Sequence, residues 1–154
     1  MHSQAPTPVD HDRVRDYQTR VIVAGSREFE NYKLFSTILD ELLPDYGDSV
    51  VFISGCADGP DSMIIQWCQE RGQPWAEYPA DWGNLDVPDA VVRTSRSGRK
   101  YNARAGLDRN VKMGDVGTHL LAFWNQRSSG TRHMRAYAIL RKLKVQTVLV
   151  DQDE

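Results

Sequence analysis

The chain has 154 residues, of which 40% are hydrophobic and 26% charged, a profile typical of one globular domain with a substantial core. Its 19 lysines and arginines against 21 aspartates and glutamates give a formal net charge of −2, which excludes a global positive field for nucleic acid or membranes. The two cysteines, Cys56 and Cys68, lack the spacing of a zinc site or a disulfide framework, so we expect reduced thiols and no bound metal. Without a long apolar run or an export signal, we expect no membrane partner and a cytoplasmic location.

The first half of the chain predicts an alternation of strands and helices. Residues 1–19 lack apolar periodicity and predict a flexible tail. The apolar run at residues 21–24 predicts a buried strand. Helical spacing from Asn31 to residue 43 then predicts a helix that Asn31 caps and Pro44 ends. A second strand, a helix and a short third strand are expected at residues 50–53, 60–71 and 74–78.

The second half resumes the alternation after a long insert. Residues 83–104 have no sustained periodicity and carry five basic side chains against two acidic ones. A loop of this length in a compact domain is typically functional or disordered. After it we expect a short helix at residues 104–113, a fourth strand at 119–123, a helix at 131–143 and a last strand at 145–150.

This alternation predicts an α/β fold. Strands separated by helices of about a dozen residues form a doubly wound parallel sheet, here of about five strands, with helices on both faces in three α/β/α layers. We expect one domain at residues 20–150, between the tail at 1–19 and a short acidic tail at 151–154.

Loops of small residues follow three of the predicted strands. Gly25, Ser26 and Arg27 follow the first, Ser54 and Gly55 the second, and residues 125–131 the fourth. The carboxyl ends of parallel strands share one edge, and ligands bind there where the strand order reverses. With the first strand central and the fourth beside it, the first and last of these loops should enclose a ligand.

The residue types in these loops favour a phosphate. Gly130 leaves room for ligand oxygens to approach the backbone, and Thr131 offers a hydroxyl and a free amide at the positive end of a helix. Guanidinium groups can donate paired hydrogen bonds to phosphate oxygens, an amide can bind a sugar or base, and indole rings can stack on a base. These further candidates are Arg27, Arg109, Arg132, Asn110, Trp82 and Trp124.

Each candidate also has a purely structural interpretation. Gly25 can end a strand, Ser129 can cap a helix, Gly130 can form a turn, and an aspartate such as Asp61 is common at a helix start. His133 is equally well explained as a surface residue or as a ligand contact. Convergence of three loops at one edge favours a binding site over these separate interpretations.

Several ordered motifs resemble the YspA-like, cpYpsA-related branch of the SLOG superfamily. They lie at residues 21–29, 54–61, 79–82, 105–113, 122–124 and 129–134. Relatives of this branch include the lonely-guy phosphoribohydrolases and DNA-processing protein A. The resemblance implies a Rossmann-like domain, often dimeric, that binds a nucleotide or nucleotide-derived molecule. It implies ligand contacts from Gly25, Ser26, Arg27, Gly55, Asp61, Arg109, Asn110, Ser129, Gly130 and Thr131.

Two departures from the family pattern bear on activity. The phosphoribohydrolases place glutamates directly after their glycine loop, whereas residues 131–135 of this chain hold no carboxylate. The insert at residues 83–104 also separates motifs that are nearly adjacent in the family.

We therefore predict binding or sensing of a nucleotide-like phosphorylated small molecule, without a further cofactor, by a homodimer. One alternative is N-glycosidic hydrolysis of nucleoside 5′-monophosphates, with Asp61 or Glu28 as the catalytic carboxylate, so the question of enzymatic activity stays open. The second is single-stranded nucleic-acid binding through the basic insert and Trp82. It ranks last because the whole chain is slightly acidic.

Overall fold

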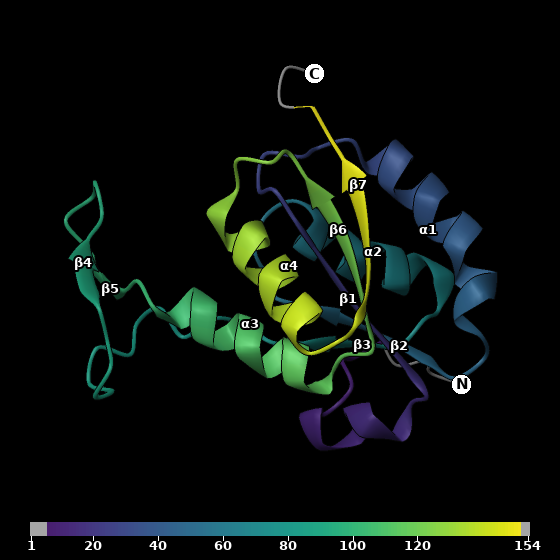
Figure 1. Ribbon diagram of the computed structural model, residues 1–154, viewed down its shortest axis with the longest axis horizontal. Coiled ribbons are helices and arrows are strands. Elements are labelled where there is room, and N and C mark those ends of the chain that lie inside the picture. Colours follow the sequence, from purple (N-terminus) through teal and green to yellow (C-terminus); the bar gives the residue numbers. More distant parts are fainter. Residues whose placement is uncertain (1–5, 152–154) are drawn as a thin grey trace.

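A five-stranded parallel sheet forms the centre of the computed structural model, which describes residues 6–151 (Figure 1). Its strands are β1 (Thr19–Gly25), β2 (Val50–Ser54), β3 (Trp75–Glu77), β6 (His119–Trp124) and β7 (Lys144–Leu149). They lie in the order β3-β2-β1-β6-β7, and every neighbouring pair is parallel. This confirms the predicted α/β fold. It also places β1 between β2 and β6, as the argument for a ligand site requires.

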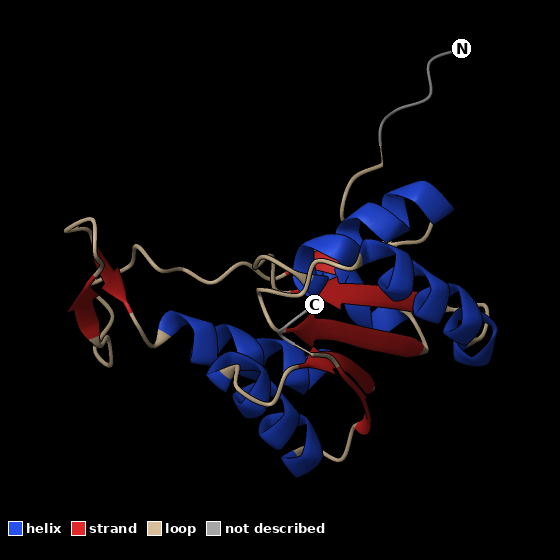
Figure 2. Ribbon diagram, turned by 90° about the horizontal axis from the view of Figure 1, so that it is seen from above, coloured by secondary structure: helices blue, strands red, loops and turns tan. Residues whose placement is uncertain are grey.

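Helices cover both faces of the sheet, which gives three layers (Figure 2). The helices are α1 (Tyr32–Tyr46), α2 (Pro60–Arg71), α3 (Ala105–Val116) and α4 (Ser129–Leu140). Val21 and Val23 of β1 pack into the core that includes side chains of α1 and α2, whereas Ile22 and Ala24 pack into the core with side chains of α3 and α4. Because successive strand residues point to opposite faces, a strand covered on both sides is apolar throughout.

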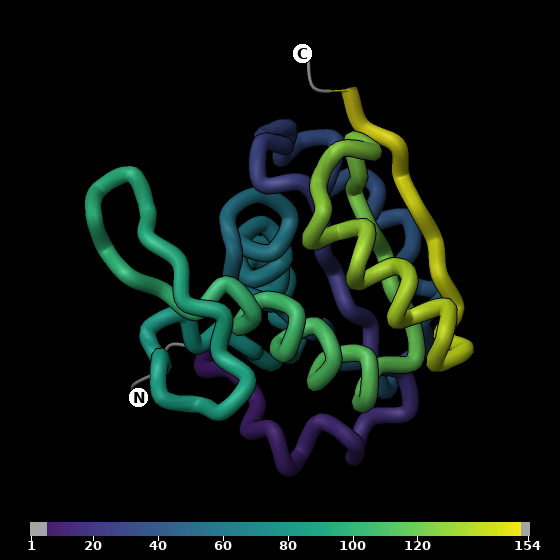
Figure 3. The backbone as a smooth tube through the Cα atoms, turned by 60° about the vertical axis from the view of Figure 1, so that its left-hand side comes forward, coloured from purple at the N-terminus to yellow at the C-terminus, as the bar shows by residue number. Residues whose placement is uncertain are grey.

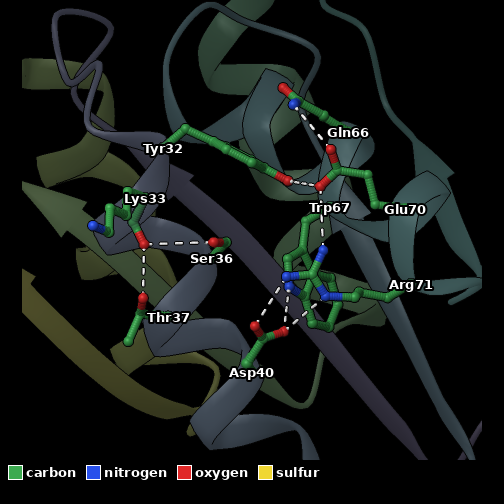
Figure 4. Close-up of polar contacts among 9 residues, drawn as sticks. All are labelled: Tyr32, Lys33, Ser36, Thr37, Asp40, Gln66, Trp67, Glu70 and Arg71. Carbon is green, nitrogen blue, oxygen red and sulfur yellow. Dashed lines mark hydrogen bonds and ion pairs between the residues drawn. The ribbon is translucent and has the colours of Figure 1, made fainter.

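A polar network joins α1 to α2 (Figure 4). Arg71 donates two hydrogen bonds to the Asp40 carboxylate, at 3.0 and 2.9 Å, and the Trp67 indole donates a third at 3.0 Å. These bonds lower the pKa of Asp40, with that from Arg71 contributing most. The Tyr32 hydroxyl donates to Glu70 in the same network. The network fixes the packing of the two helices on one face of the sheet.

Several helix boundaries differ from the predicted ones, and two of the differences have a clear local cause. Helix α1 continues past Pro44 to Tyr46, and Gly47, with φ of 82°, follows it. Proline removes one backbone donor in the last turn but does not prevent that turn from forming. Helix α4 begins at Ser129, two residues earlier than predicted, because Ser128 caps it.

The described part of the N-terminal segment is packed against the domain, unlike the flexible tail expected for residues 1–19. It contains a 3-10 helix, His11–Asp16, in which Val14 is completely buried. The His11 ring stacks on the ring of Tyr78 with centroids 3.8 Å apart, and the Val9 amide donates to the Trp75 carbonyl. A single buried valine produces no periodic pattern of apolar residues, so the sequence could not reveal that this segment packs against the domain. Residues 1–5 of that expected tail, and 152–154 of the acidic one, lie outside the described residues.

The insert contains regular structure that its sequence did not predict. Strands β4 (Val92–Thr94) and β5 (Lys100–Asn102) form an antiparallel hairpin that projects from the domain beyond the start of α3 (Figures 1 and 3). The buried side chain of Asn102 accepts hydrogen bonds from the amides of Val91 and Arg104 and so closes the base of the hairpin. Strands of three residues are too short for an alternating pattern to be recognised.

Within the described part of the chain, the structure contains no helix long and apolar enough to span a membrane.

Candidate functional site

A cavity of about 820 Å³ opens at the carboxyl ends of β1 and β6. Ten of the predicted ligand-binding residues line it: Gly25, Ser26, Arg27, Asp61, Trp82, Arg109, Asn110, Ser129, Gly130 and Thr131. The two catalytic candidates, Asp61 and Glu28, also line it. The topology thus brings segments that are distant in sequence to one cavity at the predicted edge of the sheet.

Ser26 joins the loop after β1 to the loop after β6. Its side chain, only 2% exposed, accepts a hydrogen bond from the Asn125 amide at 3.0 Å, and its own amide donates to the Phe123 carbonyl. Gly59, with φ of 81°, packs against this loop so closely that a Cβ there would lie 2.6 Å from the Ser26 carbonyl oxygen. Only glycine combines that conformation with that approach. The backbone at Ser26 and Arg27 is therefore held rigidly at the mouth of the cavity.

The Arg27 guanidinium is available to a ligand. Its central carbon lies 5.9 Å from the centre of the Trp82 ring, within the range of a cation–π contact. Among residues 6–151 it has no hydrogen-bond or ion-pair partner. A guanidinium with unused donors at the rim of a cavity is well suited to an anion.

The first turn of α4 presents backbone amides to the cavity. The Ser128 hydroxyl accepts from the Thr131 amide at 3.3 Å and pairs with the Thr131 hydroxyl at 2.9 Å. Thr131 therefore lacks the free amide that the sequence suggested, and the cap is Ser128 rather than Ser129. The amides of Ser129 and Gly130 have no acceptor among the described residues, and a Cβ at Gly130 would meet no described atom within 4 Å. In the first turn of α4, the amides without an acceptor among the described residues are therefore those of Ser129 and Gly130 and not that of Thr131.

Helix α3 is held against its neighbours by Arg109 and Asn110. Arg109 donates to the Gly55 carbonyl, and its Nε donates to the Asn110 side-chain oxygen at 3.1 Å. The Asn110 amide nitrogen donates to the Gly130 carbonyl at 3.2 Å and to Nδ1 of His133 at 3.1 Å. Burial lowers the pKa of His133 and so favours the neutral ring, in which Nδ1 can accept this bond. Asn110 thus uses both amide hydrogens inside the protein and positions the start of α4.

Asp61 is a buried carboxyl group beside these arginines. Its side chain is 5% exposed, and burial raises its pKa to about 6, against the opposing effects of Arg109, the Ala57 amide and Arg27. A Cβ at Gly55 would lie 2.5 Å from Nη1 of Arg109 and 2.7 Å from Oδ2 of Asp61. Glycine at this position therefore allows the carboxyl and guanidinium groups to flank the loop after β2.

The lining of the cavity has an excess of positive charge, whereas the whole chain has a formal net charge of −2. Five arginines line it: Arg27, Arg93, Arg104, Arg109 and Arg127. They face only two carboxylates in that lining, Glu28 and Asp61. A concave surface with such a charge balance concentrates anions. Among the described residues, no group of three or more His, Cys, Asp or Glu side chains is arranged to hold a metal ion.

Five predicted residues lie outside the lining of this cavity. Gly55 lines a smaller adjoining one, and Ser54 is buried, with its hydroxyl donating to the Asp61 carbonyl at 2.7 Å. The Trp124 ring is 8% exposed and donates to the Ser128 carbonyl at 3.1 Å. Arg132 lies over that ring, and His133 contacts Asn110. Ser54, Trp124, Arg132 and His133 thus make contacts within the protein next to the cavity.

Sequence reasoning missed the contribution of the hairpin to the cavity. Val91, Arg93, Ala103 and Arg104 all line it. The basic character of Arg93 and Arg104 is visible in the sequence, but their position depends on the Asn102 amide, which donates to the Trp82 carbonyl at 2.7 Å. This tertiary contact has no sequence signature.

The structure defines a Rossmann-like α/β domain with an arginine-lined cavity at the carboxyl edge of its sheet. Residues 19–84 match the model of the YspA, cpYpsA-related SLOG family. This match agrees with the resemblance that the motifs of the chain indicated.

Solved structures of DNA processing protein A share this fold. The protein from Streptococcus pneumoniae has 14% sequence identity and a TM-score of 0.66, with 90% of this chain and 53% of that chain covered. The protein from Helicobacter pylori, described for its single-stranded DNA binding mode, has 15% identity and a TM-score of 0.57, with 94% and 71% covered. This chain thus spans about half the length of the pneumococcal structure, and the likeness at this identity concerns the fold alone. The comparison with curated proteins gave no match.

Proposed function

We propose that the cavity binds a nucleotide or a nucleotide-derived phosphorylated ligand. The observation that carries this proposal is the meeting of Arg27, Arg109 and the open first turn of α4 around one concave space of about 820 Å³. That volume lies in the range of small-molecule and cofactor sites.

A phosphate is the chemical group that this arrangement fits. The unpartnered amides of Ser129 and Gly130 and the positive end of α4 would receive its oxygens, and Arg27 would supply a guanidinium fork. Leu107 and Met113 provide apolar wall, and Trp82 provides a ring face for a base or ribose. A nucleotide requires hydrogen-bond donors for its phosphate and apolar surface for its base or ribose, and the lining of this cavity contains both.

Calorimetry against a panel of nucleoside mono-, di- and triphosphates tests the proposal. Arg27→Ala should weaken binding by about tenfold or more, because it removes a charge-assisted hydrogen-bond donor. Arg13→Ala is the matched control, since Arg13 is exposed on the N-terminal 3-10 helix and lies outside the cavity lining. It should change affinity by less than about twofold. A folded wild-type protein that binds no member of the panel would contradict the proposal.

Hydrolysis of the ligand is the alternative activity, and Asp61 favours it. A carboxyl group in the cavity wall with a pKa of about 6 can exchange a proton near neutral pH. Incubation with nucleoside monophosphates followed by chromatography would reveal released base and ribose phosphate. Asp61→Asn should abolish that release, whereas turnover that survives it would assign catalysis elsewhere, with Glu28 as the next candidate.

Single-stranded nucleic acid is a second candidate ligand, which the hairpin favours. Arg93 and Arg104 line the cavity, and the hairpin continues outward with Arg96, Arg99 and Lys100, while residues 90–107 contain no carboxylate. The fold is also that of a protein described as binding single-stranded DNA. Binding of an oligonucleotide should fall steeply with salt, and the triple change of Arg96, Arg99 and Lys100 to serine should reduce the slope. Unchanged strand affinity in that variant would exclude the hairpin.

Homodimer formation belongs to the same proposal and rests on the family resemblance. Light scattering coupled to size-exclusion chromatography would distinguish a monomer of 17.5 kDa from a dimer.

A further inference from the structure

The two outer edges of the parallel sheet differ in how they are covered. The edge strand β3 is three residues long, and the N-terminal segment lies along it: the Val9 amide donates to the Trp75 carbonyl, and the His11 ring donates to the Glu77 carbonyl. The opposite edge strand, β7, is six residues long and pairs with β6 alone among the described strands (Figure 1). An uncovered edge of that length can pair with a further strand.

Alternate residues of β7 turn their backbone groups toward this open edge. The amides of Lys144 and Val150, at either end of the strand, donate to carbonyl groups on the β6 side. Because backbone groups alternate in direction along a strand, the amides at odd-numbered positions point away from β6. None of these outward amides donates to another described residue. They belong to Val145, Thr147 and Leu149.

The composition of β7 does nothing to prevent pairing at this edge. Between Lys144 and Asp151 the chain has no charged residue, no proline and no glycine, and most side chains are β-branched. Exposed edge strands are normally protected by charges, proline or a bulge. The segment at residues 145–150 is therefore suited to lie beside another strand.

Apolar side chains beside the open edge are strongly exposed. Leu140, Leu149 and Ile139 are 73%, 64% and 58% exposed, the highest values among the large apolar side chains of the described residues. Ile139 and Leu140 lie in the last turn of α4, which is joined to β7 by the bond from Nε of Arg135 to Oγ1 of Thr147 at 2.9 Å. Burial of these side chains would stabilise a contact along the edge.

The charges at the two ends of β7 favour a second copy of the chain in the antiparallel orientation. Lys142 and Lys144 lie at the start of the strand, and Asp151 follows its end. Antiparallel pairing of two copies places the basic end of each strand near the acidic end of the other, whereas parallel pairing would bring like charges together. The strand is thus complementary to itself, as a two-fold interface requires.

We propose that a second copy of the chain pairs with β7 in the antiparallel orientation about a two-fold axis at Thr147. The pairing joins the two five-stranded sheets into one continuous sheet. Thr147 then lies opposite the same residue of the second copy, and Val145 lies opposite Leu149 of that copy, so all three outward-facing residues are used. This inference rests on the homodimer of the proposed function and names its surface, and it does not depend on a ligand.

Light scattering coupled to size-exclusion chromatography of the full-length protein, over a dilution series, tests this surface with Leu149→Lys. Because Leu149 is exposed, the variant should fold, which circular dichroism checks. Each dimer acquires two lysines beside apolar strand residues, so its dissociation constant should rise by about a hundredfold. Val92→Lys is the matched control, since Val92 is also exposed and lies on the hairpin, far from β7 (Figures 1 and 3). It should dimerise like the wild type.

Thr147→Cys tests the register of the pairing. Directly opposed residues in a hydrogen-bonded antiparallel pair have Cα atoms about 5.5 Å apart, a separation that a disulfide spans. Mild oxidation should therefore give a covalent dimer on a non-reducing gel. Thr94→Cys, at an exposed position on the hairpin, should stay monomeric on the same gel.

The outcomes distinguish this inference from the proposed homodimer. Dissociation by Leu149→Lys but not by Val92→Lys, together with the crosslink at position 147, would support the β7 surface. A wild-type dimer that Leu149→Lys leaves intact, or that Thr147→Cys does not crosslink, would overturn this surface and leave the homodimer standing. A wild-type protein that is monomeric at every concentration would overturn both.

Discussion

Asp61→Asn is expected to stabilise the protein at neutral pH and to leave its stability unchanged in acid. In the folded state burial raises the pKa of Asp61 from 3.8 to about 6. The difference of about two pH units corresponds to about 3 kcal/mol, because each unit is worth about 1.4 kcal/mol. That free energy is the cost of holding the ionised carboxylate in the fold, net of its interactions with Arg109, the Ala57 amide and Arg27.

The sign of the pH dependence follows from proton binding. Between pH 3.8 and about 6 the folded state holds the Asp61 proton more tightly than the unfolded state, so stability falls as pH rises through this window. Asparagine carries no charge at any pH and can still accept from the Ala57 amide, which lies 3.4 Å from Oδ2. The variant should therefore gain about 1 to 3 kcal/mol over the wild type at pH 7.5 and almost nothing at pH 4.

Urea unfolding followed by circular dichroism at pH 4, 6 and 7.5 measures this difference. Asp58→Asn, at an exposed position three residues away, is the control and should change stability by less than about 0.5 kcal/mol. A variant of Asp61 that is less stable than the wild type at pH 7.5 would refute the reasoning. It would mean that the carboxylate is ionised and held by Arg109 to the benefit of the fold.

Three further substitutions test other parts of the account. Gly130→Ala should weaken nucleotide binding by about tenfold, because its Cβ enters the cavity. The same change should raise the stability of α4 by up to about 1 kcal/mol, because alanine favours a helix more than glycine does. Calorimetry and thermal melts of one preparation measure the two effects. Gly55→Ala should destabilise the fold by about 1 to 3 kcal/mol, because its Cβ would lie 2.5 Å from Arg109 and 2.7 Å from Asp61; urea titration with unchanged stability would show that the two side chains move apart freely. Val14→Ala should cost about 2 kcal/mol in the same titration, since Val14 is completely buried, and a neutral result would mean that the N-terminal segment does not dock in solution.

The sequence alone was sufficient to predict a parallel sheet with helices on both faces, whereas the central position of β1 beside β6 was an assumption that the structure confirms. Continuous apolar runs such as residues 21–24 identify strands covered on both faces, and the alternation with helices fixes parallel pairing. Together with a central first strand, these two facts predict that Arg27 and Gly130 lie at the same edge of the sheet. In the structure both residues line one cavity at that edge. Local patterns suffice here because strand direction determines where each loop emerges.

The parts that sequence reasoning missed depend on single tertiary contacts. Asn110 is of a type that could bind a sugar or base, and in the structure its amide hydrogens bind Gly130 and His133 across the helix interface. Trp124 is of a type that could stack on a base, and in the structure its indole donates to the Ser128 carbonyl. Amide and indole side chains can contact either a ligand or another part of the protein. Only the distances between the helices and strands decide which of these contacts forms. The same holds for Val14, whose burial depends on a groove that the rest of the chain creates.

A crystal structure of the protein soaked with a nucleotide that it binds in calorimetry tests the central claim most directly. The account predicts phosphate density within hydrogen-bond distance of the Gly130 amide or of the Arg27 and Arg109 guanidinium groups. Phosphate density bound only along the hairpin at residues 92–102, or an empty cavity at saturating ligand concentration, would contradict it.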